Sequence, residues 1–220
     1  MTSANAANVG SFPATGSSWQ ERIEGMEVFV GWHDWATAEP ELRELVPATT
    51  ADDVAAAVTF ATGWHGDQRR PTGAPYLEHL LEALEVLVRG AGETSRDVLC
   101  AAVLHDVVED TSCTIADVEQ AFGPHVAELV GWVTIPPAGP ADKARVKEAY
   151  LKHLTEAPDD AKLVKLADRV SNVQTLRNLK PEKQRSYYAQ TITYILPLAR
   201  EFPWFAGWYA TWQQAHADLA

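Results

Sequence analysis

The chain has 220 residues, of which 46% are hydrophobic and 9% aromatic. This length fits one domain with short extensions, and the apolar content is ample for a single core, which excludes intrinsic disorder over most of the chain. The 18 basic and 30 acidic side chains give a formal net charge of −12, which repels nucleic acid and anionic lipid surfaces and excludes both as general partners.

The first residues of the chain lack the features of a targeting signal. Residues 1–18 contain neither a positive charge nor an apolar block, and we expect a disordered tail followed by an N-terminal extension over 19–50. No run approaches the roughly 18 apolar residues of a membrane-spanning helix. The only cysteines, Cys100 and Cys113, form no C-x-x-C pair, so we expect reduced thiols. The sequence therefore predicts a cytoplasmic protein.

The rest of the chain shows helical periodicity and no alternating pattern typical of a strand. Pro71 and Pro75 end one helix and open the next, and Thr114 with Asp117 has the spacing of a capping box. The helix that starts near Ser95 is mostly apolar, so we expect it at the centre of an all-α bundle. The expected helices cover residues 51–64, 75–90, 95–107, 114–123, 125–133, 141–154, 159–179, 181–200 and a short segment ending near 219.

Tryptophans cluster towards the two ends of the chain. Trp204, Trp208 and Trp212 recur at four-residue intervals and share one helical face. We expect residues 201–220 to form a Trp-rich helix that packs on the domain and meets the N-terminal side. The alternative is that these rings form a homodimer interface or a binding platform. The tryptophans that precede the helical body are Trp19, Trp32 and Trp35.

One imidazole and three carboxylates fall within six residues of an otherwise apolar helix. His105 and Asp106 are adjacent, and Asp106, Glu109 and Asp110 have the i, i+3, i+4 spacing that places side chains on one face of a continuous helix. Burying these groups without a cation is costly, and a divalent ion would compensate them. The alternative is a satisfied core histidine beside a solvated acidic helix end.

Two residues elsewhere in the chain extend this cluster. His79 lies on the opening turn of a helix with an apolar stripe, and Asp168 lies between Leu166 and Val170 of another apolar helix. With the His105-Asp106 pair they form a set drawn from three helices, which is how a helical bundle builds an octahedral nitrogen and oxygen site. Two imidazoles and two carboxylates leave coordination positions for water and substrate.

Several blocks in the same order identify a resemblance. These blocks are Tyr76 to His79 after a basic loop, Leu104 to Thr111, Phe122-Gly123 with Val130 to Thr134, and Lys165 to Arg169 with Asn172. They closely resemble the RelA/SpoT hydrolase branch of the HD domain superfamily over about residues 54–198. The resemblance implies an all-α HD domain over 51–200. Since a synthetase half has no room here, it also implies a small stand-alone alarmone hydrolase.

The same resemblance implies a chemistry and a set of roles. The expected enzyme is a manganese-dependent pyrophosphohydrolase that converts ppGpp or pppGpp to GDP or GTP and pyrophosphate, although iron or zinc would also suit such ligands. The implied metal ligands are His79, His105, Asp106 and Asp168. The implied catalytic pair that handles the attacking water is Glu109 and Asp110. The implied substrate-binding residues are Arg70, Arg169, Asn172 and Thr175.

The expected substrate is an anion, whereas the chain is acidic, so local cations must form a positive mouth. The candidates are Arg69, Arg70, Lys143, Arg145, Lys147, Lys165, Arg169 and Arg177. For the three in the 143–147 segment, a solvated surface position is the main alternative. His65 matches a family position just ahead of the basic loop, and we expect a structural role for it.

The sequence departs from the family pattern at a few positions near the expected site. Pro71 and Ala74 stand where a lysine and an acidic residue are usual, Leu80 stands where proline is common, and Ser171 where histidine is common. These departures concern base selectivity more than hydrolysis. Two alternative functions therefore stay open: an HD hydrolase of another nucleotide, such as ppApp or NADPH, and a non-catalytic nucleotide-binding regulatory domain.

Overall fold

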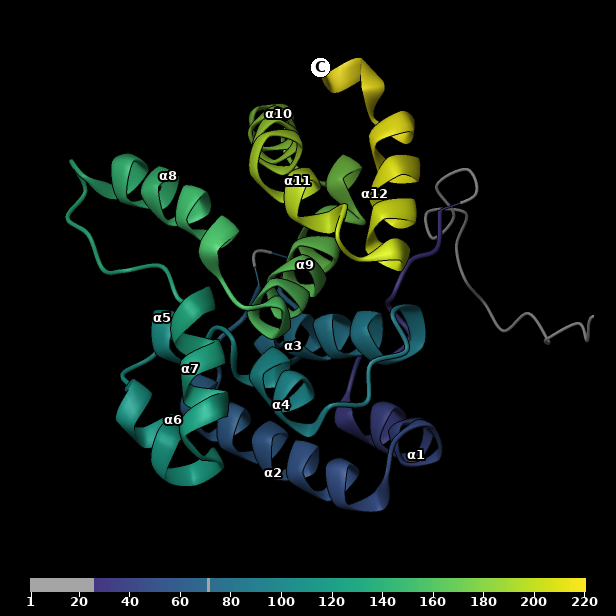
Figure 1. The fold of residues 1–220 in the computed structure, drawn as a ribbon, viewed down its shortest axis with the longest axis vertical. Helices are drawn as coiled ribbons and strands as arrows, with labels where there is room; N and C mark the ends of the chain where they lie inside the picture. Colours follow the sequence, from purple (N-terminus) through teal and green to yellow (C-terminus); the bar gives the residue numbers. More distant parts are fainter. Residues whose placement is uncertain (1–25, 71) are drawn as a thin grey trace, which may run out of the picture.

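The computed structural model describes residues 26–70 and 72–220, and these residues form helices joined by short connections (Figure 1). The described residues contain no β-strand, only an isolated bridge between Arg69 and Pro75 in the basic loop. The prediction of an all-α fold is confirmed. The predicted tail over 1–18 and residues 19–25 of the predicted extension lie outside the described residues. Within them, no helix is both long and apolar enough to span a bilayer.

Helix α4 forms the centre of the bundle, as its apolar sequence predicts. It packs against α2, α3, α7 and α9, and every residue from Val98 to Leu104 is fully buried. Helix α9 lies beside it and contacts α3, α7 and α11 as well, so α9 joins the lower and upper parts of the molecule in Figure 1. The five helices are α2 (Ala48–His65), α3 (Tyr76–Glu85), α4 (Arg96–Leu104), α7 (Pro124–Val133) and α9 (Asp159–Val173).

The capping signals in the sequence place helix ends correctly. Helix α6 (Ile115–Phe122) begins after Thr114, whose hydroxyl accepts from the Asp117 N–H while the Asp117 carboxylate accepts from the Thr114 N–H. Gly123 ends α6 with φ of +94°, a conformation that favours glycine, and α7 begins at the next residue. The predicted capping box is therefore confirmed.

Four long helices of the sequence-based prediction are interrupted. The one over 75–90 divides into α3 and a π-helical turn (Val86–Gly90). Helix α4 stops at Leu104, His105 and Asp106 form a turn, and a separate short helix α5 (Val107–Asp110) follows, so the predicted continuous helix through the acidic cluster is wrong. Helix α9 stops at Val173 and not at 179, with a 3₁₀ turn over Leu176–Asn178. The pattern over 181–200 divides into α10 (Pro181–Gln190), a π-helical turn (Thr191–Ile195) and α11 (Leu196–Ala199).

The segments at the two ends of the described chain pack against each other. The indole N–H of Trp208, on α12 (Pro203–Ala215), donates to the Glu27 carbonyl at 2.8 Å, and the Trp204 ring meets Phe29 edge-on at 5.6 Å. Trp212 is fully buried and donates to the Val173 carbonyl of α9. The C-terminal tryptophans therefore cover the core within one chain.

Two further helices lie at the periphery. Helix α1 (Trp35–Leu45) was not predicted, because its sequence carries Pro40 in the interior and only Ala38 and Leu42 are buried. Helix α8 (Lys143–His153) buries only Tyr150 and Leu151, and it follows the connection over 135–140 at the edge of the molecule (Figure 1).

Candidate functional site

Four side chains from three parts of the fold converge on one point. His79 lies on the first turn of α3, His105 and Asp106 occupy the turn after α4, and Asp168 lies in the middle of α9. His79 Nε2 is 3.2 Å from His105 Nε2 and 3.4 Å from an oxygen of each carboxylate. His105 Nε2 is 3.2 Å from Asp106 Oδ2 and 3.6 Å from Asp168 Oδ1. The interrupted helix allows His105 and its neighbour Asp106 to point into the same site.

Both imidazoles present the same nitrogen to this point. His105 is fully buried, and its Nδ1 lies 2.7 Å from the Ala102 carbonyl, which can only accept, so Nδ1 carries the proton. His79 Nδ1 lies 2.8 Å from the hydroxyl of Ser171. The two Nε2 atoms therefore face the carboxylates, and they are the nitrogens that could bind a metal ion in place of a proton.

The charge distribution at this point favours a cation. Burial alone lowers the pKa of His105, but Asp106 and Asp168 outweigh it and hold that pKa well above its ordinary value. Burial likewise opposes ionisation of Asp168, yet Lys165 and the two imidazoles hold its pKa well below the usual range. The two carboxylates are therefore held as anions inside an apolar bundle, an arrangement that a positive charge between them stabilises.

The donor set fits a divalent metal ion. Ligand atoms about 2.1 Å from an octahedral ion and at right angles to one another lie about 3 Å apart, close to the observed separations of 3.2–3.6 Å. Two imidazole nitrogens and two carboxylate oxygens suit manganese, iron or zinc. Ligand atoms of His79, His105 and Asp168 all lie within 4.8 Å of one another, a group of three that does not include Asp106, whose contacts are with the two imidazoles.

An acidic pair lies next to this centre. Glu109 accepts a hydrogen bond from the Ile135 N–H at 2.9 Å, and burial raises the pKa of its carboxyl. The hydroxyl of Tyr76 lies 2.5 Å from both Asp106 Oδ2 and Asp110 Oδ2. Since a phenol has one proton to donate, Tyr76 can bond only one of these two carboxylates at a time, and its hydroxyl lies between the metal-centre carboxylate and the second acidic residue. The sequence analysis did not assign this role to Tyr76.

These groups open onto a cleft with a volume of about 560 Å³ between α3, α8 and α9. All predicted site residues except His105 line it, and His105 lies buried behind His79. Asn172 donates to the carboxylate oxygen Oδ1 of Asp168 at 2.5 Å, so it contacts a predicted ligand directly. The lining residues with predicted roles are Arg70, His79, Asp106, Glu109, Asp110, Asp168, Arg169, Asn172 and Thr175.

Cations line one wall of the cleft. The Arg169 guanidinium is buried 5.3 Å above the Tyr187 ring, and its Nε and Nη1 have no hydrogen-bond partner among the described residues. Lys165 is buried and bonds to Asp168 Oδ2 at 2.6 Å. Burial, followed by the charges of Arg169 and Lys165, lowers the pKa of Lys147. This wall carries more positive charge than its own anions neutralise, so it favours an anionic ligand.

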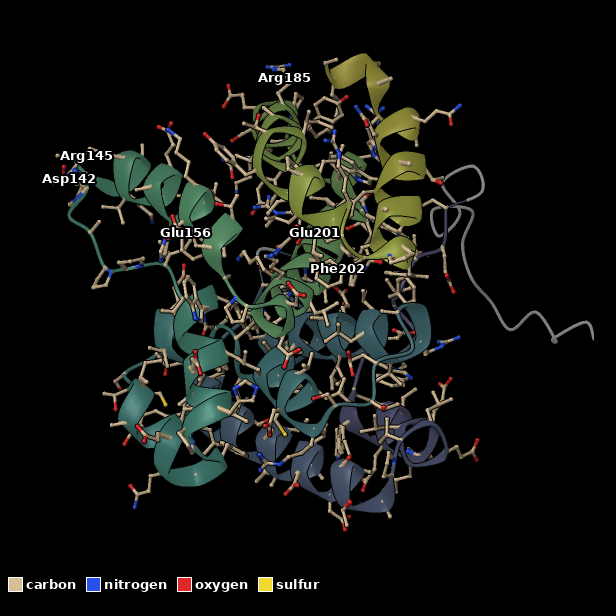
Figure 2. All side chains as sticks on the ribbon, viewed as in Figure 1. Asp142, Arg145, Glu156, Arg185, Glu201 and Phe202 are labelled. Carbon is tan, nitrogen blue, oxygen red and sulfur yellow. The ribbon has the colours of Figure 1, made fainter. Side chains whose placement is uncertain are left out.

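Other predicted cations lie elsewhere. Arg145 pairs with Asp142 at 2.8 Å, and Figure 2 shows both at the outer end of α8. Arg177 pairs with Asp218, and neither Lys143 nor Arg69 lines the cleft. The positive mouth is therefore narrower than the sequence analysis expects.

The basic loop approaches the cleft through Arg70, which is not free. Its Nη1 pairs at 3.0 Å with Glu82, a carboxylate buried on α3. Burial raises the pKa of Glu82, and Arg70 opposes that rise. The sequence analysis missed Glu82, although an acid within the apolar stripe of Leu80, Leu81 and Leu84 was a usable signal. His65 stacks on Tyr76 with ring centroids 4.5 Å apart, which agrees with a structural role.

Comparisons with known proteins agree with this geometry. The family model of the HD domain matches residues 57–201. The chain is 41% identical over 128 residues to human guanosine-3′,5′-bis(diphosphate) 3′-pyrophosphohydrolase MESH1, covering 57% of this chain and 70% of that protein. It is 36% identical over 153 residues to the enzyme of the same name, without the MESH1 designation, from Aquifex aeolicus (strain VF5), covering 68% of this chain. The chain spans only 21% of that relative's length.

Further matches extend this set. The bifunctional (p)ppGpp synthase/hydrolase SpoT of Escherichia coli (strain K12) is 37% identical over 147 residues, which cover 65% of this chain and 21% of SpoT. The solved structure of a metazoan ortholog of SpoT superposes with a TM-score of 0.66 at 28% identity, covering 74% of this chain and 94% of that one. The chain therefore belongs to the HD domain family, in the branch that contains the (p)ppGpp hydrolases MESH1 and SpoT.

Proposed function

We propose that the protein is a metal-dependent 3′-pyrophosphohydrolase that converts ppGpp or pppGpp to GDP or GTP and pyrophosphate in the cytoplasm. The observation that carries this proposal is the convergence of two imidazole Nε2 atoms and two carboxylates beside an acidic pair and a cationic wall. The names of the relatives supply the substrate class. All the residues with proposed roles come from one chain, so a homodimer is not required for the chemistry.

His79, His105, Asp106 and Asp168 would hold the divalent ion, for which we propose Mn²⁺ because the set mixes nitrogen and oxygen donors. When bound, such an ion makes water more acidic and offsets charge that develops on phosphoryl oxygens. The residues around the ligands hold them in place. Lys165 bonds one oxygen of Asp168, and Tyr76 bonds Asp106.

Glu109 is the proposed general base. Its pKa is raised by burial, which brings its basicity closer to the neutral pH at which it must accept a proton. The Ile135 N–H holds one of its oxygens and leaves the other for the attacking water. Hydrolysis forms a bond from that water to the inner phosphorus and breaks the bond from phosphorus to the ribose 3′ oxygen. One proton of the water passes to Glu109, and the 3′ oxygen takes up a proton from solvent as it leaves, which makes it a hydroxyl. Asp110 lines the same cleft as Glu109, with its carboxylate beside the Tyr76 hydroxyl, and we propose that it shares the handling of this water.

The cationic wall resolves the conflict between an acidic protein and an anionic substrate. Lys147, Lys165 and Arg169 line the same cleft as the metal centre and concentrate positive charge there, so they would bind the phosphate groups. Arg70 lines the cleft at the basic loop, while Asn172 and Thr175 lie along α9 and its end. We propose that these three contact the nucleoside.

The proposed function is tested by pyrophosphate release from ppGpp, with ppApp and NADPH as parallel substrates. We expect turnover of ppGpp that EDTA abolishes and Mn²⁺ restores. Turnover of ppApp or NADPH without turnover of ppGpp would support a hydrolase of this class but contradict the proposed preference for a guanine nucleotide. Absence of turnover on all three substrates in the presence of bound Mn²⁺ would contradict the proposal that the protein is an enzyme and favour a non-catalytic regulatory domain.

The role of Glu109 predicts a loss of chemistry without a loss of metal. The variant Glu109→Gln keeps the size of the side chain and removes its basicity, so kcat should fall by about 10²- to 10⁴-fold while Mn²⁺ content is unchanged. The matched control is Glu119→Gln, an exposed acid on α6 that should leave kcat unaltered. Near-normal kcat for Glu109→Gln would remove it as the base.

The cationic wall predicts a selective effect on substrate binding. Lys147→Met keeps much of the apolar stem and removes the charge, so KM for ppGpp should rise by about tenfold with a smaller change in kcat. Lys143→Met, at the exposed start of the same helix and outside the cleft, is the control. Equal KM values for the two variants would show that Lys147 does not bind the phosphates.

A further inference from the structure

Glu82 is a buried carboxylate that the proposed mechanism does not use. It lies on α3 between core residues, and it is 4% exposed while Leu81 and Leu84 beside it are fully buried. A carboxylate in such surroundings is stable only when its oxygens accept hydrogen bonds from defined partners. The identity of these partners shows what the charge does in this fold.

Each oxygen of Glu82 contacts a different part of the site. Oε1 accepts from Nη1 of Arg70 at 3.0 Å, and Arg70 lines the cleft from the basic loop. Oε2 accepts from the hydroxyl of Ser171, which is 1% exposed on α9. The same hydroxyl oxygen lies 2.8 Å from Nδ1 of His79. Glu82 is thus connected directly to Arg70 of the basic loop and, through Ser171, to His79 of the metal centre.

The order of donors along this chain of contacts determines the tautomer of His79. An ionised carboxylate only accepts, and Ser171 has a single proton, which it donates to Glu82. The serine oxygen must then accept from His79, so His79 carries its proton on Nδ1. Its Nε2 is left to face Asp106 and Asp168. Outer partners of this kind orient metal-binding imidazoles and tune their affinity for metal.

The second histidine of the centre, His105, is oriented without a side-chain partner. His105 donates from Nδ1 to the backbone carbonyl of Ala102, a partner that no side-chain substitution removes. The orientation of His79 therefore depends on two side chains, Ser171 and Glu82, whereas that of His105 depends on the path of α4.

We propose that Glu82 is a positioning residue for both the metal centre and the substrate-binding side of the cleft. Through Ser171 it holds His79 in its metal-binding tautomer, and through Arg70 it holds the basic loop against the cleft. This inference rests on the proposed function, because it assumes that His79 binds an ion and that Arg70 contacts substrate. A purely structural ion pair would not predict a specific loss in both Mn²⁺ affinity and KM for ppGpp, whereas this positioning role does.

A second buried carboxylate on the same helix provides the control. Glu85 is 1% exposed and pairs with Arg89, and it accepts from the Trp32 N–H at 3.0 Å. Its chemistry matches that of Glu82, but its partners lie outside the cleft. Replacing either glutamate by methionine, a side chain of similar size, removes one buried charge from α3. A general destabilisation of the helix should therefore appear in both variants.

The first measurement is Mn²⁺ affinity, read from the electron paramagnetic resonance signal of free Mn²⁺ in titrations of the full chain. Ser171→Ala and Glu82→Met should each weaken Mn²⁺ binding by about 10- to 100-fold. Glu85→Met should stay close to wild type, with circular dichroism showing that all variants are folded. Wild-type affinity in a folded Ser171→Ala or Glu82→Met, or an equal loss in Glu85→Met, would overturn the inference.

The second measurement is KM for ppGpp at saturating Mn²⁺. Glu82→Met should raise KM as much as Arg70→Ala does, whereas Ser171→Ala should not, because it leaves the pair of Arg70 with Glu82 intact. An unchanged KM in Glu82→Met would overturn the part played through Arg70. Failure of the proposed function is distinguishable, because in that case the wild-type protein itself would bind no Mn²⁺ or release no pyrophosphate.

Discussion

The structure depends on holding two carboxylates and two imidazoles together inside an apolar helical bundle. Asp106 and Asp168 both approach His79 Nε2 at 3.4 Å, and the surrounding helices exclude water from most of this cluster. Such a cluster is stable only if its charges and hydrogen-bonding groups are compensated from every side. The fold meets this requirement with Lys165, Tyr76 and Ser171, each of which bonds directly to one of the four side chains.

The apolar surfaces of the helices bring these groups together. Helix α4 is buried on all sides, so it must lie between α2, α3, α7 and α9, and this placement brings the turn after Leu104 beside the start of α3 and the middle of α9. The same packing opens the cleft between α3, α8 and α9, where the cations of α8 and α9 face the metal centre. An acidic protein can thus present a local positive wall to an anionic ligand, because Lys147, Lys165 and Arg169 gather on one side of the cleft.

Much of this arrangement follows from the sequence, and the remainder follows from tertiary contacts. Capping residues such as Thr114 and Gly123 act locally, so helix ends near them were predictable. The break at His105 was not, because the apolar pattern continues through it. Tyr76 contacts Asp106, 30 positions away in the chain, and Glu82 contacts Ser171, 89 positions away. Only the folded structure reveals that Tyr76 and Glu82 connect parts of the site. For Arg145 the sequence left a place in the positive mouth and a solvated surface position both open, and its pair with Asp142 at the edge of α8 agrees with the surface position.

The proposed chemistry requires the four converging side chains to bind one divalent ion. Crystals grown with Mn²⁺ and measured at the manganese absorption edge test it directly, since anomalous scattering locates the ion independently of any model of catalysis. We expect a single strong peak within about 2.3 Å of His79 Nε2, His105 Nε2 and an oxygen of both Asp106 and Asp168. A peak held by other residues, or saturating Mn²⁺ without a peak at this point, would contradict it.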